Sequence, residues 1–101
     1  MVTRTGLTGV LILQALSQGY RFGFDIMQVT GLPSGTIYPA LRRLESLEFV
    51  TSDWEKDVSA RKEGRPRRRY YALTQMGRRA LNESEARLQA VGRLVPRRET
   101  P

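Results

Sequence analysis

The chain has 101 residues, of which 17 are Lys or Arg and 10 are Asp or Glu, so its formal net charge is +7 at neutral pH. This length suits one domain with a thin core, and the positive charge favours a polyanionic partner such as nucleic acid or an anionic membrane surface. The absence of Cys and His excludes disulfides, thiolate metal sites and catalysis by either side chain.

The sequence shows no sign of secretion or of a membrane anchor. The longest apolar run, residues 10–13, is too short to cross a bilayer, and no signal peptide is visible. We therefore expect a cytoplasmic protein without a membrane partner. We also expect no enzymatic activity, no metal and no cofactor, because the alternating acids Asp53, Glu55 and Asp57 are more simply interpreted as the solvent-facing edge of a strand.

Two helices are predicted near the N-terminus. Apolar residues at helical spacing predict the first over residues 6–18, with Gly19 as its stop signal. Its apolar face is broad, which suggests that part of it is buried against a second subunit. The aromatic segment 20–24 leads into a short second helix. The residues there that can share one core face are Phe22, Ile26 and Val29.

A third helix is predicted from Ser34, a favourable N-cap, to about Leu47. The inner face of its helical wheel holds Ile37, Ala40, Leu41, Leu44 and Leu47. The outer face holds Gly35, Tyr38, Pro39, Arg42 and Ser46. Pro39 is tolerable because its ring meets the carbonyl of a glycine close to the helix start.

A β-hairpin is predicted after the third helix. Residues 49–57 and 69–73 have the alternation and aromatic content of strands. The segment 58–68 between them is polar and contains the turn residues Gly64 and Pro66. We therefore predict that a long basic loop with a mobile tip joins the two strands.

Thr74 is predicted to cap a last helix that runs to about Val95. Apolar residues recur on it every seven positions, which is typical of a coiled-coil seam, although Gly77 and Ser84 interrupt the pattern. The side chains predicted to form a dimer interface are Leu81, Leu88, Val91 and Val95. Residues 96–101 are predicted to be a disordered tail.

The predicted fold is mainly α with a β-hairpin, a winged helix-turn-helix plus a C-terminal dimerisation helix. We place the winged helix-turn-helix, a DNA-binding domain, at residues 6–74. The dimerisation helix follows at residues 75–95, before the tail.

Positive charge concentrates between the two predicted strands. Six basic residues and one acidic residue lie in the segment 61–69, so it carries +5 of the net charge of +7. A charge run alone is often only a solvated loop. Beside a candidate recognition helix, clustered basic charge favours contact with nucleic acid, on phosphates or in the minor groove. The wing residues predicted to bind DNA are Lys62, Gly64, Arg65, Arg67 and Arg68.

The third helix is the candidate for reading bases, because a helix fits the major groove of B-DNA. The backbone amides at its start also suit a phosphate. Its predicted DNA-binding residues are Ser34, Gly35, Thr36, Tyr38, Pro39 and Arg42. The alternative for Tyr38 is an ordinary half-buried surface aromatic. Arg43 lies between the two faces of the wheel and is interpreted as solvated.

Residues 35–44, Gly-Thr-Ile-Tyr-Pro-Ala-Leu-Arg-Arg-Leu, resemble the PadR family of transcriptional regulators. The resemblance spans roughly residues 7–81 and includes Gly64-Arg65-Pro66-Arg67 and the following Tyr70-Tyr71. It implies a winged-helix homodimer, held by the C-terminal helix with help from the first. It also implies binding to an inverted-repeat operator on double-stranded DNA, usually as a repressor that is released by a small-molecule effector, here of unknown identity.

The resemblance also implies DNA-binding roles for the residues that match the family's motif. Ser34, Thr36, Tyr38 and Arg42 would lie in or beside the major groove, and Gly64, Arg65 and Arg67 would form the wing.

The sequence departs from the family pattern at two places. Glu48 stands where the family usually has a glycine after the third helix, so this helix end either adopts another geometry or bears a strain of about 1 kcal/mol. Some short members stack flat drugs on a Trp of the C-terminal helix, whereas the only Trp here, Trp54, is predicted on a strand. Sensing of that kind is therefore not expected.

A second interpretation of the same features is a winged-helix interaction module whose basic wing binds an acidic protein or RNA. Preference for one duplex DNA sequence over others would separate the two functions.

Overall fold

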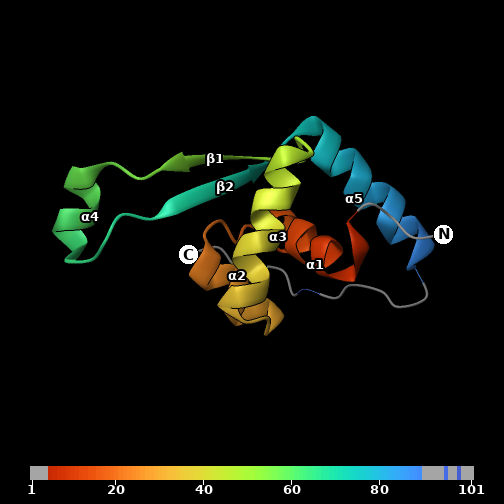
Figure 1. The fold of residues 1–101 in the computed structure, drawn as a ribbon, viewed down its shortest axis with the longest axis horizontal. Helices are drawn as coiled ribbons and strands as arrows, with labels where there is room; N and C mark the ends of the chain where they lie inside the picture. The colour runs from red at the N-terminus through yellow and green to blue at the C-terminus, as the bar shows by residue number, and fades with distance from the viewer. Residues whose placement is uncertain (1–4, 90–94, 96–97, 99–101) are drawn as a thin grey trace.

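The predicted order of three helices, a hairpin and a final helix is confirmed (Figure 1). The computed structural model describes residues 5–89, 95 and 98. The elements are α1 (Gly6–Ser17), α2 (Gly23–Thr30), α3 (Ser34–Ser46), β1 (Val50–Trp54), α4 (Asp57–Glu63), β2 (Arg69–Leu73) and α5 (Gln75–Arg87). Within this described part of the chain, no helix has the length and apolar character needed to cross a membrane.

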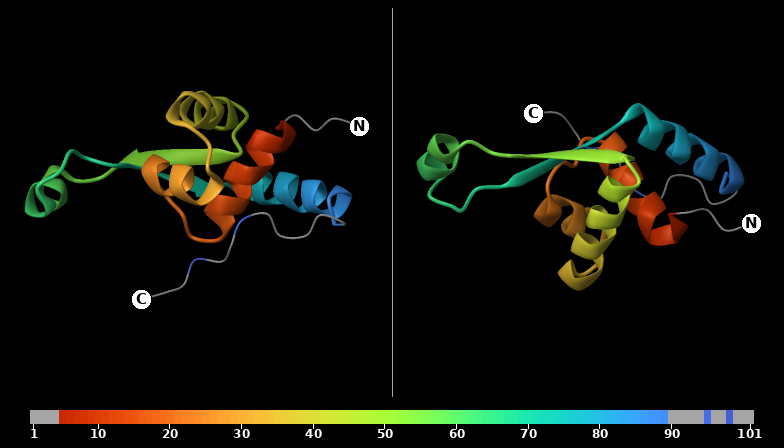
Figure 2. Two further views of the ribbon diagram at one scale, coloured as in Figure 1. Left: turned by 90° about the horizontal axis from the view of Figure 1, so that it is seen from below. Right: turned by 45° about the horizontal axis from the view of Figure 1, so that its top comes forward.

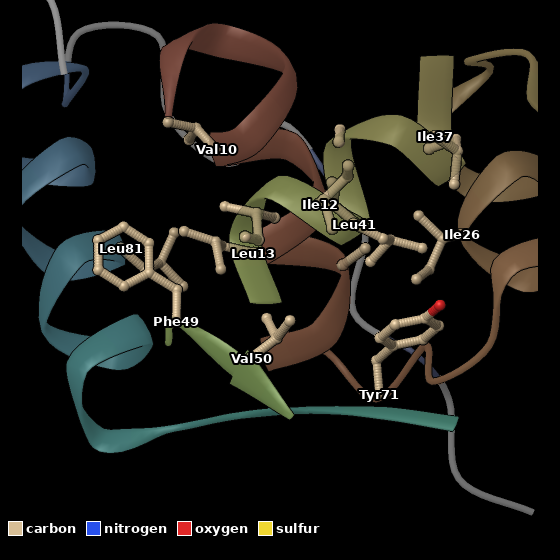
Figure 3. Packing of buried hydrophobic residues seen from close by; sticks show 14 residues of the cluster. Val10, Ile12, Leu13, Ile26, Ile37, Leu41, Phe49, Val50, Tyr71 and Leu81 are labelled. Atoms are coloured by element: carbon tan, nitrogen blue, oxygen red, sulfur yellow. The ribbon is translucent and has the colours of Figure 1, made fainter. Parts of the chain in front are cut away.

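One apolar core holds the helices and the hairpin together (Figure 3). The fully buried side chains of α3 are Ile37, Ala40, Leu41 and Leu44, which confirms its predicted inner face, although Leu47 is only half-buried. Burial of one such aliphatic side chain stabilises the fold by about 1.5–3 kcal/mol. Facing them are Ile12, Leu13, Ile26, Val50 and Tyr71, from α1, α2, β1 and β2.

The two strands pair antiparallel and project from the helices as a wing. Their register runs from the Val50–Leu73 pair to the Trp54–Arg69 pair. β2 spans its predicted range, whereas β1 ends at Trp54 because Asp57 begins the next helix. Figures 1 and 2 show the hairpin and α5 leaving the helical core on opposite sides.

The base of the hairpin is tied to the segment that precedes α2. Phe22 forms an isolated antiparallel bridge with Tyr70, and their rings meet edge to face at 5.7 Å. The backbone N–H of Tyr71 donates to the carbonyl of Arg21 at 2.8 Å. The wing therefore has a fixed base beside the second helix.

The tip of the hairpin is a helix, so the prediction of an irregular loop there is wrong for residues 57–63. The acid Asp57 lies in the first turn of α4, and Arg61 and Lys62 lie in the last, which matches the helix dipole at both ends. Gly64 ends the helix with a left-handed φ of 66°. In Figure 1, α4 lies at the far end of the hairpin from the helical core.

The N-terminal caps of α3 and α5 differ from each other. Ser34 is the first residue of α3 rather than its N-cap, and the cap residue Pro33 makes no side-chain hydrogen bond. The carbonyl of Pro33 instead accepts the first backbone bonds of the helix. The prediction for Thr74 is confirmed, because its hydroxyl accepts from the N–H of Gly77 at 2.9 Å.

Helix α5 is shorter than predicted, because it ends at Arg87 and residues 88 and 89 form a turn. Leu81 and Val95 are buried in the core of their own chain. Val95 is therefore not part of a continuous seam on this helix. Val91 lies outside the described residues, and the role of these side chains in dimerisation stays a prediction.

Arg98, which lies in the predicted tail, contacts the helical core, and disorder of the tail stays a prediction. Its backbone N–H donates to the carbonyl of Gln18 at 3.3 Å, and its guanidinium pairs with Asp25 at 2.7 Å. The remaining positions of the predicted tail, 96–97 and 99–101, lie outside the described residues.

The end of α3 has the strained geometry that the sequence left open. Glu48 adopts a left-handed conformation with φ 65°. Its N–H donates to the carbonyl of Glu45 at 2.9 Å, and its own carbonyl accepts from the Thr74 hydroxyl at 2.6 Å. These bonds hold Glu48 in a conformation that is unfavourable for any residue with a Cβ.

Glu48→Gly is expected to raise the free energy of unfolding by about 0.5–1 kcal/mol, since relief of the left-handed strain exceeds the added entropy of the unfolded chain. Thermal unfolding followed by circular dichroism should show Tm higher by about 2–8 °C. Glu83→Gly, at an exposed position within α5, is the control and should lower stability by about 0.5–1 kcal/mol. A fall in Tm for both variants would contradict strain at Glu48.

Candidate nucleic-acid interface

The outer face of α3 presents the residues that the sequence predicted for DNA contact. Helices α2 and α3 are joined by a three-residue turn in the manner of a helix-turn-helix. Of the α3 residues predicted to bind DNA, Thr36 is half-buried and the others are exposed: Ser34, Gly35, Tyr38, Pro39 and Arg42. The described part of the chain contains no carboxylate partner for Arg42. Its guanidinium is therefore available to a ligand.

The side chain of Tyr38 packs against the start of α2. Its side chain packs on Gly23, where an added Cβ would stand 2.3 Å from the phenol oxygen and 2.6 Å from ring carbons. The residue is 40% exposed, so one edge of the ring faces solvent. Sequence analysis did not single out Gly23 as part of the site; the signal for it was a glycine between two aromatic residues at the start of a helix. Gly23 is needed because it leaves room for Tyr38.

The wing is organised around one carboxylate, Glu55. Both of its oxygens accept from the guanidinium of Arg65, at 2.6 and 2.8 Å, and one also accepts from the N–H of Arg68 at 3.2 Å. Its backbone carbonyl accepts from Nε of Arg67 at 2.7 Å. Glu55 was predicted to lie on a solvent-facing edge, yet its side chain is only 10% exposed. The prediction missed this role because Glu55 and its arginine partners are ten or more residues apart in the sequence and meet only when the hairpin forms.

The ion pair shifts the titration of both partners. The hydrogen bonds from Arg65 lower the pKa of Glu55 from 4.5 to about 2, and they outweigh the opposing effect of desolvation. The same hydrogen bonds raise the pKa of Arg65 above its ordinary value. Since the folded-state pKa of Glu55 is depressed, its contribution to stability is present above pH 4.5 and is lost as the pH falls through about 2.

An NMR titration of the Glu55 side-chain carboxyl is expected to give a midpoint at about 2. In Arg65→Gln the midpoint should move up toward 4.5, because the largest cause of the shift has been removed. Lys56→Gln removes a neighbouring exposed charge and should leave the midpoint low. A midpoint near 4.5 in the wild type would mean that the ion pair does not persist in solution.

The other wing arginines differ in how free they are. Arg67 also pairs with Asp57 at 3.2 Å. Arg69 donates to the hydroxyl of Ser52 at 3.0 Å and pairs with Glu45 at 3.5 Å. Arg68 has no acidic partner among the described residues for its guanidinium.

The structure brings part of the predicted set together around one hollow. A cavity of about 640 Å³ opens between α3 and the wing, with aromatic and guanidinium groups in its walls. Among its lining residues are Tyr38, Arg42, Trp54, Arg65, Arg67 and Arg68. Lys62 and Gly64 lie apart from it, exposed at the end of α4. Aromatic faces beside the unpaired guanidinium groups of Arg42 and Arg68 suit a nucleic-acid backbone.

Comparisons with known proteins found a matching family model and similar solved structures. Residues 12–83 match the sequence profile of the Transcriptional regulator PadR-like family. The chain is similar to the solved structure of a PadR-like transcription factor from Bacteroides fragilis, at 28% identity and a TM-score of 0.72, over 87% of this chain and 85% of that one.

Two further solved structures are similar to the chain. A PadR family transcription regulator from Clostridium difficile R20291 has 27% identity and a TM-score of 0.74, over 85% of this chain and 91% of that one. One from Eggerthella lenta DSM 2243 has 30% identity and a TM-score of 0.63, over 82% and 75%. A search of curated proteins found no match.

Proposed function

Because the chain belongs to the Transcriptional regulator PadR-like family, we propose that it binds an inverted-repeat operator as a homodimer and represses transcription. Its membership makes it a DNA-binding transcription regulator. The observation that carries the finer proposal is the outer face of α3. It is exposed, has an unpaired Arg42 and opens onto the same hollow as the basic wing.

In this proposal, α3 and the wing contact different parts of the DNA. The proposal places α3 in the major groove, where Tyr38 and Arg42 can reach base edges. The wing arginines then meet phosphates beside it, or the narrower minor groove. In a symmetric dimer the two copies of α3 read half-sites about one helical turn apart, roughly 34–36 Å.

The proposed dimer surface lies on α1 and α5, which pack against each other in the protomer. Leu7 of α1 is 61% exposed although it is a large apolar side chain, and Leu88 at the end of α5 is half-buried. A second copy would cover such side chains. Leu81 and Val95 already fill the core of their own chain.

A small-molecule effector that releases the operator is part of the proposal on the family resemblance alone. Trp54, the only Trp of the sequence, is the last residue of β1 and 55% exposed. It lies on the wing, so a flat drug stacked on a Trp of the C-terminal helix is not the expected mode of release.

Fluorescence anisotropy with a labelled duplex from upstream of the protein's own gene, compared with a shuffled duplex across a salt series, tests the proposed function. Preference for the native duplex of about 10³-fold or more at ~150 mM salt would support a specific regulator. Equal binding to both duplexes that disappears with salt would overturn it. That result would favour the alternative function, a winged-helix interaction module whose basic wing binds an acidic protein or RNA.

A further inference from the structure

The wing contains an acid at its centre, although the surface around it is basic. Glu55 accepts bonds from two neighbouring arginines and carries a negative charge at neutral pH, since its pKa is about 2. A carboxylate so close to a DNA-binding surface should repel phosphates. Its presence there is explained if it fixes the geometry of cations that do bind DNA.

Arg68 is the cation that this geometry leaves free. Its N–H is held by the Glu55 carboxylate at 3.2 Å, while its guanidinium carbon lies 4.0 Å from the ring centroid of Phe22. Phe22 is the N-cap residue of α2 and packs on Tyr70 of β2. Arg68 is therefore held by the wing through its backbone and by the helix-turn-helix through its side chain.

The hollow between α3 and the wing has a volume of about 640 Å³ and is lined by cations and aromatic rings. Arg68, Phe22 and Trp54 line it together with Tyr38 and Arg42 of α3. A guanidinium stacked on an aromatic ring still presents its N–H donors in plane, where they suit the oxygens of a phosphate. The aromatic walls give apolar surface for the adjoining deoxyribose.

We propose that Glu55, although acidic, is required for tight binding of DNA. It fixes Arg65 and Arg68 so that the Arg68 guanidinium binds one backbone phosphate in the hollow between α3 and the wing. This inference rests on the proposed function only in needing duplex DNA as the partner, because a phosphate contact carries no base preference. Glu55 is a positioning residue and Arg68 makes the contact.

Charge alone predicts the opposite result, which makes the proposal easy to test. Glu55→Gln makes the protein more positive by one, and long-range electrostatics would then tighten DNA binding. Asp53→Asn makes the same change of charge on β1, where the residue pairs with Tyr70 through its backbone and its exposed side chain forms no ion pair in the described part of the chain. It is the matched control for charge. Arg78→Gln, at an exposed position on α5, is the matched control for Arg68→Gln.

The experiment measures anisotropy of a labelled random-sequence duplex across a salt series for the full chain and these four variants. Relative to Asp53→Asn, Glu55→Gln should bind about tenfold more weakly at low salt. Its slope of log K against log salt should be smaller by about one unit. The slope for Arg68→Gln should be smaller than that for Arg78→Gln by the same amount. Asp53→Asn itself should bind as tightly as the wild type or slightly more tightly.

The slope separates positioning from loss of structure. A variant that is merely less folded binds more weakly by the same factor at every salt concentration, because only its competent fraction has fallen. An unchanged slope in Glu55→Gln or Arg68→Gln would therefore overturn the proposal, as would binding by Glu55→Gln as tight as that of Asp53→Asn. Failure to prefer the native duplex overturns only the proposed function. Failure of the wild type to bind any duplex overturns both.

Discussion

Gly77→Ala is expected to lower the free energy of unfolding by about 2–3 kcal/mol, a large part of the stability of a small domain. A Cβ at this buried position would stand 1.9 Å from the carbonyl oxygen of Phe49 and 2.8 Å from its carbonyl carbon. Neither backbone can easily move away. The N–H of Gly77 is bound by the hydroxyl of Thr74, and the carbonyl of Phe49 accepts from the N–H of Thr74 at 3.0 Å.

Thermal unfolding followed by circular dichroism should show a fall in Tm of about 10–20 °C. Gly35→Ala is the control, because a Cβ at that helical position meets nothing within 4 Å. It should leave Tm unchanged or raise it slightly, since alanine favours a helix. A wild-type Tm in Gly77→Ala would mean that the start of α5 does not sit on Phe49 in solution.

Arg42→Ala is expected to weaken binding to the operator by about 10- to 100-fold, while binding to a random duplex falls much less. The physical reason is that an unpaired guanidinium on the outer face of α3 can reach base edges, whose hydrogen bonds depend on sequence. Tyr38→Phe should erode the same discrimination by removing a hydroxyl and little else. Both are measured by anisotropy with the native and shuffled duplexes at one salt concentration.

Arg43→Ala provides the matched control for Arg42→Ala. Arg43 is the next residue of α3, is exposed and has no acidic partner in the described ranges. Both substitutions remove one positive charge, so a difference between them reports position rather than charge. If Arg42→Ala weakens both duplexes by an equal factor, its side chain positions the protein on phosphates and does not read bases.

The sequence predicted best what depends on local periodicity. The two faces of α3 follow from a wheel over thirteen residues, and the structure buries one and exposes the other. The range of β2 was predicted because Arg69–Leu73 is rich in aromatic residues beside a turn. In each case neighbours in sequence carry the information.

The sequence failed where the structure depends on a short segment or on distant residues. Helix α4 is only seven residues long and shows little periodicity, so its charged ends were the only signal. Val95 follows the heptad pattern of a long helix, but α5 ends at Arg87 and Val95 is buried in the core of its own chain. Glu55 has an alternating pattern of exposed acids around it, and only hairpin pairing reveals Arg65 as its partner. The left-handed end at Glu48 was one of two options, and tertiary bonds from Thr74 select it.

The contact between Gly23 and Tyr38 has a consequence for how such a regulator acquires a new target. Position 23 is buried and meets the ring of Tyr38, so any larger residue there must push the ring outward. If α3 reads bases as proposed, one mutation at position 23 changes which bases this helix accepts without itself contacting DNA. Libraries made to redirect the protein to another promoter should therefore vary position 23 together with position 38, because the two act as one unit of selection.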